Sequence, residues 1–244
     1  MAKTIAIVNQ KGGVGKTTTS INLAASFAAM KRRVMLIDLD PQGNATVGSG
    51  VYKEHIKYTS DQVLCQEVDI KDALIKTDSG YDVLATNQEL IVAEMQLLHA
   101  PQREQRLKSI LAPLQTAYDY ILIDCPPSLS VLTVNALNAA NSVLIPIQCE
   151  YYALEGLKAL LNTIEQIRTT INPQLRIEGL LRTMYDPRNT LAQNVTAELE
   201  KHFGDKLFRT LIPRNVRLAE APSHGVPALK LEPQSKGALA YLAL

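Results

Sequence analysis

The sequence has 244 residues, 46% of them hydrophobic, and a formal net charge of +1 at pH 7. This length and composition suffice for one large α/β domain, which we expect to span residues 1–244. The small net charge argues neither for nor against nucleic-acid binding, and no apolar run approaches the roughly 18 residues of a membrane span. Cysteines 65, 125 and 149 show no C-x-x-C spacing, which indicates reduced thiols in a cytosolic protein without a disulfide or metal framework.

The apolar pattern predicts strands and helices that alternate along the chain. Strands are expected over 4–8, 34–37, 81–85, 120–123, 142–147 and 177–183, with a short one over 207–211. Helices are expected from 17 to near 31–33 and over 88–99, 102–117, 131–140, 153–170 and 189–203, with short surface helices within 50–80. This alternation indicates an α/β fold, with a mostly parallel twisted sheet covered by helices on both faces. Ligands of such sheets bind at the carboxyl ends of the strands.

A glycine-rich segment with the sequence KGGVGKTTT, over 11–19, separates the first strand from the first helix. Because Gly12, Gly13 and Gly15 carry no side chains, the backbone can curl until several N–H groups point at one anion, and the helix N-terminus adds partial positive charge. Lys16 would reach the β- and γ-phosphates of a nucleotide, and the Thr17 hydroxyl would complete a Mg²⁺ shell. The alternative is a glycine-rich turn whose lysines have no ligand.

The segment departs from the general phosphate-loop pattern at its front. G-x-x-x-x-G-K-[ST] requires glycine at position 10, where this chain has Gln10, and a second lysine, Lys11, follows it. This arrangement resembles the deviant Walker A box of the ParA/MinD group of P-loop ATPases. The expected cradle consists of Lys11, Gly12, Gly13, Val14, Gly15, Lys16, Thr17 and Thr18.

A carboxylate ends the strand expected over 120–123. Asp124 follows three apolar residues, which is the Walker B pattern, and from that position it could hold Mg²⁺ through a water opposite Thr17. The alternative is an aspartate that caps a helix or a turn.

Two further carboxylates, Asp38 and Asp40, end the neighbouring strand over 34–37. Alternation along an extended chain points both in one direction and Leu39 in the other. The pair could therefore orient an attacking water, with Asp38 in the outer shell of the metal. The alternative, above all for Asp38, is that it caps a turn with residues 43–44.

Five segments together resemble the ParA/Soj chromosome-partitioning ATPases over nearly the whole chain. They are 11–19, DLDPQGN over 38–44, DCPPS over 124–128, EYYALEG over 150–156 and PRNVRLAEAP over 213–222. The resemblance implies an ATPase that forms a homodimer with Mg²⁺ and ATP, and that binds double-stranded DNA without sequence preference. It also implies a ParB-type centromere-binding partner that stimulates hydrolysis, and a cytoplasmic location on the nucleoid.

The resemblance further implies roles for single residues. Lys11 would be the signature lysine that reaches the phosphates of the other subunit, Asp40 would position the hydrolytic water, and Pro213 and Asn215 would border the adenine. A cation delivered from the partner stabilises charge on the transferred phosphoryl group, as an arginine finger does. Dimerisation would then depend on ATP, and hydrolysis would dissolve the dimer. The alternative for Lys11 is a solvated loop lysine.

The basis for DNA binding lies in a small local excess of positive charge. From residue 205 to the end, six basic residues accompany three acidic ones, and Arg188 adds another cation. In Soj-type proteins, arginines at the positions of Arg188 and Arg217 contact DNA, and Arg214 and Lys230 are further candidates. Without a recognition helix, such contacts would go to phosphates and would depend on salt. A solvated basic face is the alternative.

Other proteins of this fold suggest two alternative functions. MinD-like ATPases bind membranes through a basic amphipathic C-terminal helix, whereas residues 237–244 here read GALAYLAL, and we therefore expect no membrane contact. A small-molecule kinase or synthetase would need a substrate pocket that the sequence does not reveal. Because the first strand begins almost at residue 1, we also expect no helix-turn-helix domain before the phosphate loop.

Overall fold

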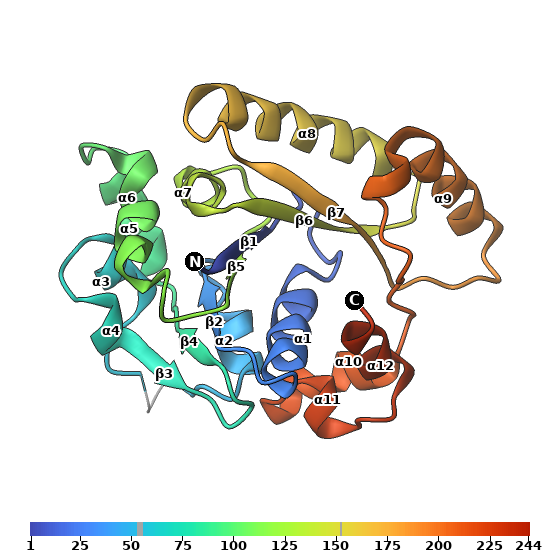
Figure 1. Ribbon diagram of the computed structural model, residues 1–244, viewed down its shortest axis with the longest axis horizontal. Helices are drawn as coiled ribbons and strands as arrows, with labels where there is room; N and C mark the ends of the chain where they lie inside the picture. The colour runs from blue at the N-terminus through green and yellow to red at the C-terminus, as the bar shows by residue number, and fades with distance from the viewer. Residues whose placement is uncertain (53–55, 152) are drawn as a thin grey trace.

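The computed structural model describes residues 1–52, 56–151 and 153–244, and in this part of the chain a seven-stranded sheet lies between two layers of helices (Figure 1). The strands follow the spatial order β3-β4-β2-β5-β1-β6-β7. Their bounds are β1 Lys3–Ile7, β2 Val34–Asp38, β3 Leu74–Lys76, β4 Asp82–Leu84, β5 Tyr120–Asp124, β6 Ser142–Gln148 and β7 Arg176–Thr183. All neighbouring pairs are parallel except β3 with β4, so the predicted α/β fold with a mostly parallel sheet is confirmed.

Helices connect all successive strands except β3 and β4, and several short helices follow β7. The α-helices are α1 Lys16–Ala29, α2 Asn44–Gly48, α3 Ser60–Leu64, α4 Ile70–Ala73, α5 Leu90–Leu97, α6 Arg106–Leu111, α7 Val131–Ala139, α8 Ala153–Thr170, α9 Thr190–Phe203, α10 Val216–Glu220, α11 Ala228–Leu231 and α12 Lys236–Leu242. Short 3₁₀ turns are η2 Arg103–Gln105, η3 Ala112–Leu114, η4 Gly204–Lys206 and η5 Ala221–His224. No helix of the described residues combines the length and apolar composition that crossing a bilayer requires.

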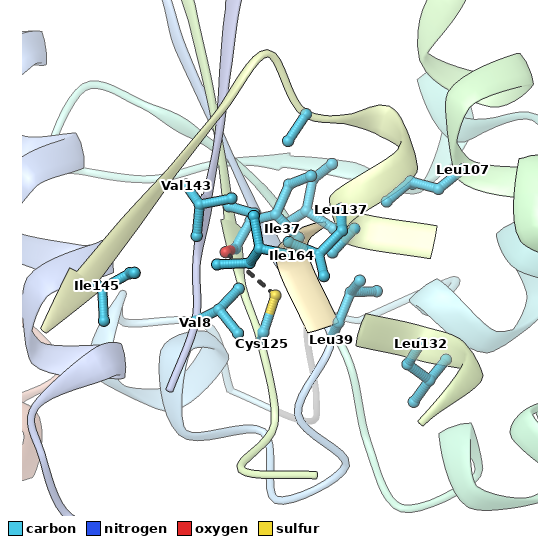
Figure 2. Close-up of a cluster of buried hydrophobic side chains, with 14 of the residues drawn as sticks. Val8, Ile37, Leu39, Leu107, Cys125, Leu132, Leu137, Val143, Ile145 and Ile164 are labelled. Carbon is cyan, nitrogen blue, oxygen red and sulfur yellow. Dashed lines mark hydrogen bonds between the residues drawn. The ribbon is translucent and has the colours of Figure 1, made fainter. Parts of the chain in front are cut away.

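The sheet is buried on both faces because alternate residues of each strand point to opposite sides. On β2, Met35 and Ile37 belong to one hydrophobic cluster, whereas Val34 and Leu36 belong to the other. Figure 2 shows the first cluster, where side chains from β2, β6 and α7 meet around Cys125, whose thiol donates a weak hydrogen bond to the carbonyl oxygen of Ile123. Full burial of one such aliphatic side chain stabilises the fold by about 1.5–3 kcal/mol.

Two predicted elements differ in the structure. The segment expected as a strand over 207–211 makes one isolated bridge to β7, between Leu207 and Leu180, and one backbone hydrogen bond, from the Phe208 amide to the carbonyl oxygen of Leu180. These contacts do not form a continuous ladder. The helix expected over 102–117 is divided into η2, α6 and η3, since a proline at position 113 cannot continue α6. The edge strand β3, which lies within the polar region 50–80, was not predicted.

The register of the central strands positions the functional loops. Ile7 at the end of β1 pairs with Asp124 at the end of β5, and Asp124 also pairs with Asp38 at the end of β2. Since these strands are parallel, the three segments that follow them leave the same edge of the sheet side by side. The glycine-rich loop and the two carboxylate motifs are therefore neighbours in space.

Candidate phosphate-binding site

The glycine-rich loop between β1 and α1 is held at both of its ends. The Asn9 side chain donates to the carbonyl oxygen of Pro146 over 2.7 Å and accepts from the Lys11 amide over 3.0 Å. Further along, the Thr183 hydroxyl donates to the carbonyl oxygen of Val14 over 2.7 Å. Within the loop, Gly13 and Gly15 have φ angles of +73° and +87°, which side chains rarely tolerate. At Gly13 a Cβ atom would meet nothing within 4 Å, so the loop stands clear of the protein there.

The first turn of α1 faces the carboxylate of β5. The Thr17 hydroxyl donates to Oδ2 of Asp124 and the Ser20 hydroxyl to Oδ1, each over 2.8 Å. Lys16 folds back over the loop, where its Nζ donates to the carbonyl oxygen of Lys11 over 3.3 Å. The structure thus brings the predicted Lys16, Thr17 and Asp124 together. The contribution of Ser20 was not predicted, because a serine within a helix carries no motif.

Charges of both signs lie close together here, since both Lys16 and Asp124 are buried. Burial raises the pKa of Asp124, whereas the hydrogen bonds from Ser20 and Thr17 lower it and favour the carboxylate. Burial lowers the pKa of Lys16, and the carboxylates of Asp124 and Asp40 oppose that shift. A hydroxyl beside a carboxylate is an all-oxygen donor set, which suits a hard cation such as Mg²⁺. The loop and this donor set therefore fit a magnesium–nucleotide complex.

The two carboxylates after β2 occupy different environments. Asp38 is fully buried, whereas Asp40 is partly exposed. The Asp40 backbone amide donates to Oδ1 of Asp38 over 3.1 Å, and Oδ1 of Asp40 accepts from the Gln42 amide over 3.0 Å. Burial, together with the charge of Asp124, raises the pKa of Asp38. Leu39 is fully buried in the core on the opposite side, as the alternation predicts.

A cavity of about 190 Å³ adjoins the glycine-rich loop. Its walls include Gly15, Thr18, Met184, Pro213, Asn215 and Tyr241. The predicted Pro213 and Asn215 therefore face the loop, although about two hundred positions separate them from it. Met184, after β7, and Tyr241, on α12, were not predicted as wall residues. The Tyr241 hydroxyl also lies 3.0 Å from the Thr19 hydroxyl of α1, so α12 is packed directly behind the loop.

The side chain of Lys11 is held by a carboxylate that follows β6. Its Nζ lies 2.5 Å from Oε2 of Glu150. Glu150 opens the motif over 150–156, of which Tyr152 lies outside the described residues. The sequence identified both segments but did not indicate that these two side chains meet.

The basic residues proposed for DNA lie in two places. Arg188 donates to both oxygens of Asp186. Arg188, and to a smaller extent Arg214, lowers the pKa of Asp186, so both arginines lie near this carboxylate. Arg217, three residues after Arg214 and on α10, pairs with Glu220 of the same helix over 2.7 Å. Lys230 lies apart on α11, where its Nζ approaches the carbonyl oxygen of residue 78 over 3.4 Å.

A glycine-rich loop between β1 and α1, with a lysine and a threonine beside a strand-end carboxylate, defines a P-loop nucleoside triphosphatase. A family model described as an AAA domain matches residues 2–177. The sporulation initiation inhibitor protein Soj of Bacillus subtilis is 51% identical and covers 100% of this chain and 97% of its own length. The chromosome partitioning protein ParA of Myxococcus xanthus is 49% identical over 100% of this chain and 87% of its own length. The chain belongs to the ParA/Soj family of chromosome-partitioning ATPases.

Solved structures agree on the fold. The cobyrinic acid a,c-diamide synthase of Mycobacterium smegmatis, with bound ADP and magnesium, has a TM-score of 0.87 and 38% identity, covering 100% of this chain and 92% of its own. The septum site-determining protein MinD of Pyrococcus horikoshii, complexed with Mg-ADP, has a TM-score of 0.80 and 26% identity, covering 99% and 93%.

Proposed function

We propose that this chain is an ATPase that segregates DNA and that works as an ATP-dependent dimer. The observation that carries this proposal is the contact of Thr17 with Asp124 beside the glycine-rich loop. In the proposed complex, backbone amides over 11–18 and the Lys16 ammonium bind the phosphates. Thr17 ligates Mg²⁺ directly and Asp124 does so through water. The similar structure from M. smegmatis, which contains ADP and magnesium, supports this assignment.

The adenine is proposed to lie in the cavity bordered by Pro213 and Asn215. Asn215 also caps α10, where its Oδ1 accepts from the Leu218 amide over 3.3 Å. That bond holds its side chain at the cavity wall. The mostly apolar walls around this amide suit a flat base with a few hydrogen-bonding groups.

The chemistry requires positioned charge. Bound Mg·ATP supplies the phosphoryl group and neutralises part of its charge, and the loop amides with Lys16 stabilise the rest. Asp40, which is partly exposed at the same edge of the sheet, is proposed to orient the attacking water. Lys11 is proposed to act in trans, across a dimer in which each subunit covers the nucleotide of the other. The dimer then persists only while the triphosphate is intact.

The ATP-dependent dimer is proposed to act by binding DNA. Arg188, Arg214 and Arg217 lie on exposed segments after β7, and a dimer would present two such sets to the phosphate backbone. Because non-specific affinity falls steeply as fewer phosphates are contacted, the monomer would be released. A ParB-type protein at a centromere-like site would stimulate hydrolysis, so that the ATPase moves a chromosome or plasmid over the nucleoid.

Two other functions occur among proteins of this fold. The M. smegmatis structure bears the name of a small-molecule synthase, yet relatives named Soj or ParA are more similar and also match nearly the whole chain. For a MinD-like membrane role, α12 itself is a poor candidate for membrane contact, because it buries Ala238 and Tyr241 in the core. These observations favour the partitioning function.

The decisive experiment compares ADP with ATP in wild type and Asp40→Ala. We expect the variant to form a long-lived dimer with Mg·ATP in gel filtration and to be retained on DNA, with only slow phosphate release. Lys16→Ala serves as the control that should lose nucleotide binding. An ATP-loaded Asp40→Ala protein that stays monomeric, or a dimer that ignores DNA and binds anionic liposomes instead, would refute the proposal.

A further inference from the structure

The carboxylate of Asp38 is enclosed by donors from its own chain. Its Oδ2 accepts from both the amide and the hydroxyl of Thr46, each over 2.8 Å, and its Oδ1 accepts from the amide of Asp40 over 3.1 Å. The side chain is fully buried. Three hydrogen bonds from two segments of the chain therefore converge on one buried side chain, which connects those segments to each other.

Thr46 connects Asp38 to the next strand of the sheet. Its hydroxyl donates to Asp38 and at the same time accepts from the backbone amide of Thr86, which follows β4, over 3.0 Å. Thr86 in turn accepts from the Ser60 hydroxyl of α3 over 2.8 Å. A hydroxyl has one donor and two acceptor sites, and Thr46 uses both kinds here. The ends of β2 and β4 and the starts of α2 and α3 are thereby tied together.

The segment between Asp38 and Thr46 carries Asp40 and has little freedom. The Gly43 amide closes a turn on the carbonyl oxygen of Asp40 over 2.8 Å. Gly43 has a φ angle of +67°, and a Cβ atom there would lie 3.2 Å from the carbonyl oxygen of Thr86. The turn is therefore pinned by Asp38 at its start, by Thr46 at its end and by the backbone of residue 86 along its side.

We infer that Asp38 and Thr46 are positioning residues, which fix the place of Asp40 through this hydrogen-bonded turn, and that Asp38 is not a member of the outer shell of the metal. The inference rests on the proposed role of Asp40 in orienting water. Both oxygens of Asp38 are engaged by Thr46 and by the backbone. Displacing a reacting group by about 1 Å can lower the rate a hundredfold. Loss of the hydrogen bonds between Asp38 and Thr46 should therefore slow ATP hydrolysis and leave nucleotide binding unchanged.

Thr46→Val and Thr46→Ser form a matched pair. Valine keeps the shape but removes the hydroxyl, which leaves one bond fewer to Asp38 and a buried amide at Thr86 without its acceptor. Serine keeps the hydroxyl. Ser49→Ala is the control, because Ser49 is a buried hydroxyl of the same region that accepts from Tyr81 over 2.9 Å and has no bond to Asp38. Thr46→Ala, which leaves room for a water, is a second test if the valine variant does not fold.

Three quantities are measured for each variant: kcat of the ATPase, the dissociation constant of a fluorescent ATP analogue, and the Mg²⁺ concentration that gives half-maximal binding of that analogue. We expect Thr46→Val to lower kcat between about tenfold and a hundredfold while both binding constants stay as in wild type. Thr46→Ser should restore kcat, and Ser49→Ala should leave it unchanged. A valine variant with wild-type kcat, or one that loses nucleotide binding in proportion, would overturn the inference.

Asp38→Asn distinguishes positioning from metal binding. A positioning role predicts a lower kcat with an unchanged Mg²⁺ requirement, whereas a raised Mg²⁺ requirement would assign Asp38 to the metal and refute the inference. Asp40→Ala is measured in parallel. If that variant hydrolyses ATP normally, the proposed role of Asp40 fails. If it is inactive while Thr46→Val is fully active, only the inference drawn here fails.

Discussion

Lys11 and Glu150 form an ion pair within one subunit, with Nζ and Oε2 2.5 Å apart. Both side chains are partly exposed, at 39% and 46% of their surface. Ion pairs of this exposure contribute about 0–1 kcal/mol, which is little enough for a phosphate to displace the carboxylate. Lys11, which is proposed to act on the partner's nucleotide, is thus held in its own subunit by Glu150. In the dimer, this ion pair can be replaced by a contact between Lys11 and the phosphates of the partner's nucleotide.

Glu150→Gln should therefore favour the dimer. Removal of the carboxylate releases Lys11 without altering the loop. Since each subunit of the dimer contains one such pair, up to about 1 kcal/mol per pair corresponds to a dimer dissociation constant up to about thirtyfold lower in ATP. Sedimentation velocity with Asp40→Ala as the background, to prevent hydrolysis, measures this shift. Glu155→Gln, an exposed change on α8, is the control. A weaker dimer in the Glu150 variant would mean that this carboxylate contributes to the interface itself.

Ser20→Ala should raise the magnesium requirement. The Ser20 hydroxyl donates to Oδ1 of Asp124 over 2.8 Å, and residues that orient a metal's ligands typically affect metal affinity by about 10–100-fold. We expect a roughly tenfold higher Mg²⁺ concentration for half-maximal binding of a fluorescent ATP analogue. Ser26→Ala removes a buried hydroxyl from the same helix, where it donates to the Asn22 carbonyl oxygen, and should have no such effect. Equal magnesium curves for the two variants would contradict this assignment.

Most of the phosphate-binding site could be predicted because its parts are local. Lys16 and Thr17 follow a strand and begin a helix, and a parallel sheet places Asp124 at the same edge by pairing β5 with β1. Periodicity and loop chemistry determine all of this over short stretches of chain. The strand-end carboxylate and the loop therefore appear in the sequence as motifs.

Contacts between distant segments carry no such signal. Glu150 lies 139 positions from Lys11, and Tyr241 lies 222 positions from Thr19. Nothing in the periodicity of either segment indicates which side chain the other will meet. β3 was missed for a different reason, since a three-residue antiparallel edge strand is too short to show alternation.

The pair of Arg33 and Asp119 predicts a change of stability in acid. The guanidinium and the amide of Arg33 donate to Asp119, and together they lower the pKa of that carboxyl to about 2. A pKa below the unfolded value of about 3.9 stabilises the fold above that pH, and the contribution is lost as the pH falls towards 2. Asp119→Asn should therefore have a lower urea midpoint than wild type at pH 7, and the difference should narrow between pH 4 and pH 3. A constant difference would contradict this linkage.

Arg217→Glu should separate DNA retention from dimerisation. Arg217 is exposed on α10 and pairs only with Glu220 of its own helix among the described residues, so its reversal disturbs neither the fold nor the nucleotide site. The ATP-bound dimer should form as in wild type, whereas DNA retention at moderate salt should be lost. Each phosphate contact removed lowers the slope of log affinity against log salt by about 0.9.

Two further charge changes locate the DNA surface. Arg188→Glu should act like Arg217→Glu, because the Arg188 side chain is 88% exposed and its pair with Asp186 is weak enough for a phosphate to replace. Lys108→Glu on α6, which lies on the opposite side of the molecule from α10 in Figure 1, is the control with the same change of net charge. If the control loses DNA as strongly as the two arginine variants, net charge rather than this surface governs binding. If all three retain DNA, the surface lies elsewhere on the dimer.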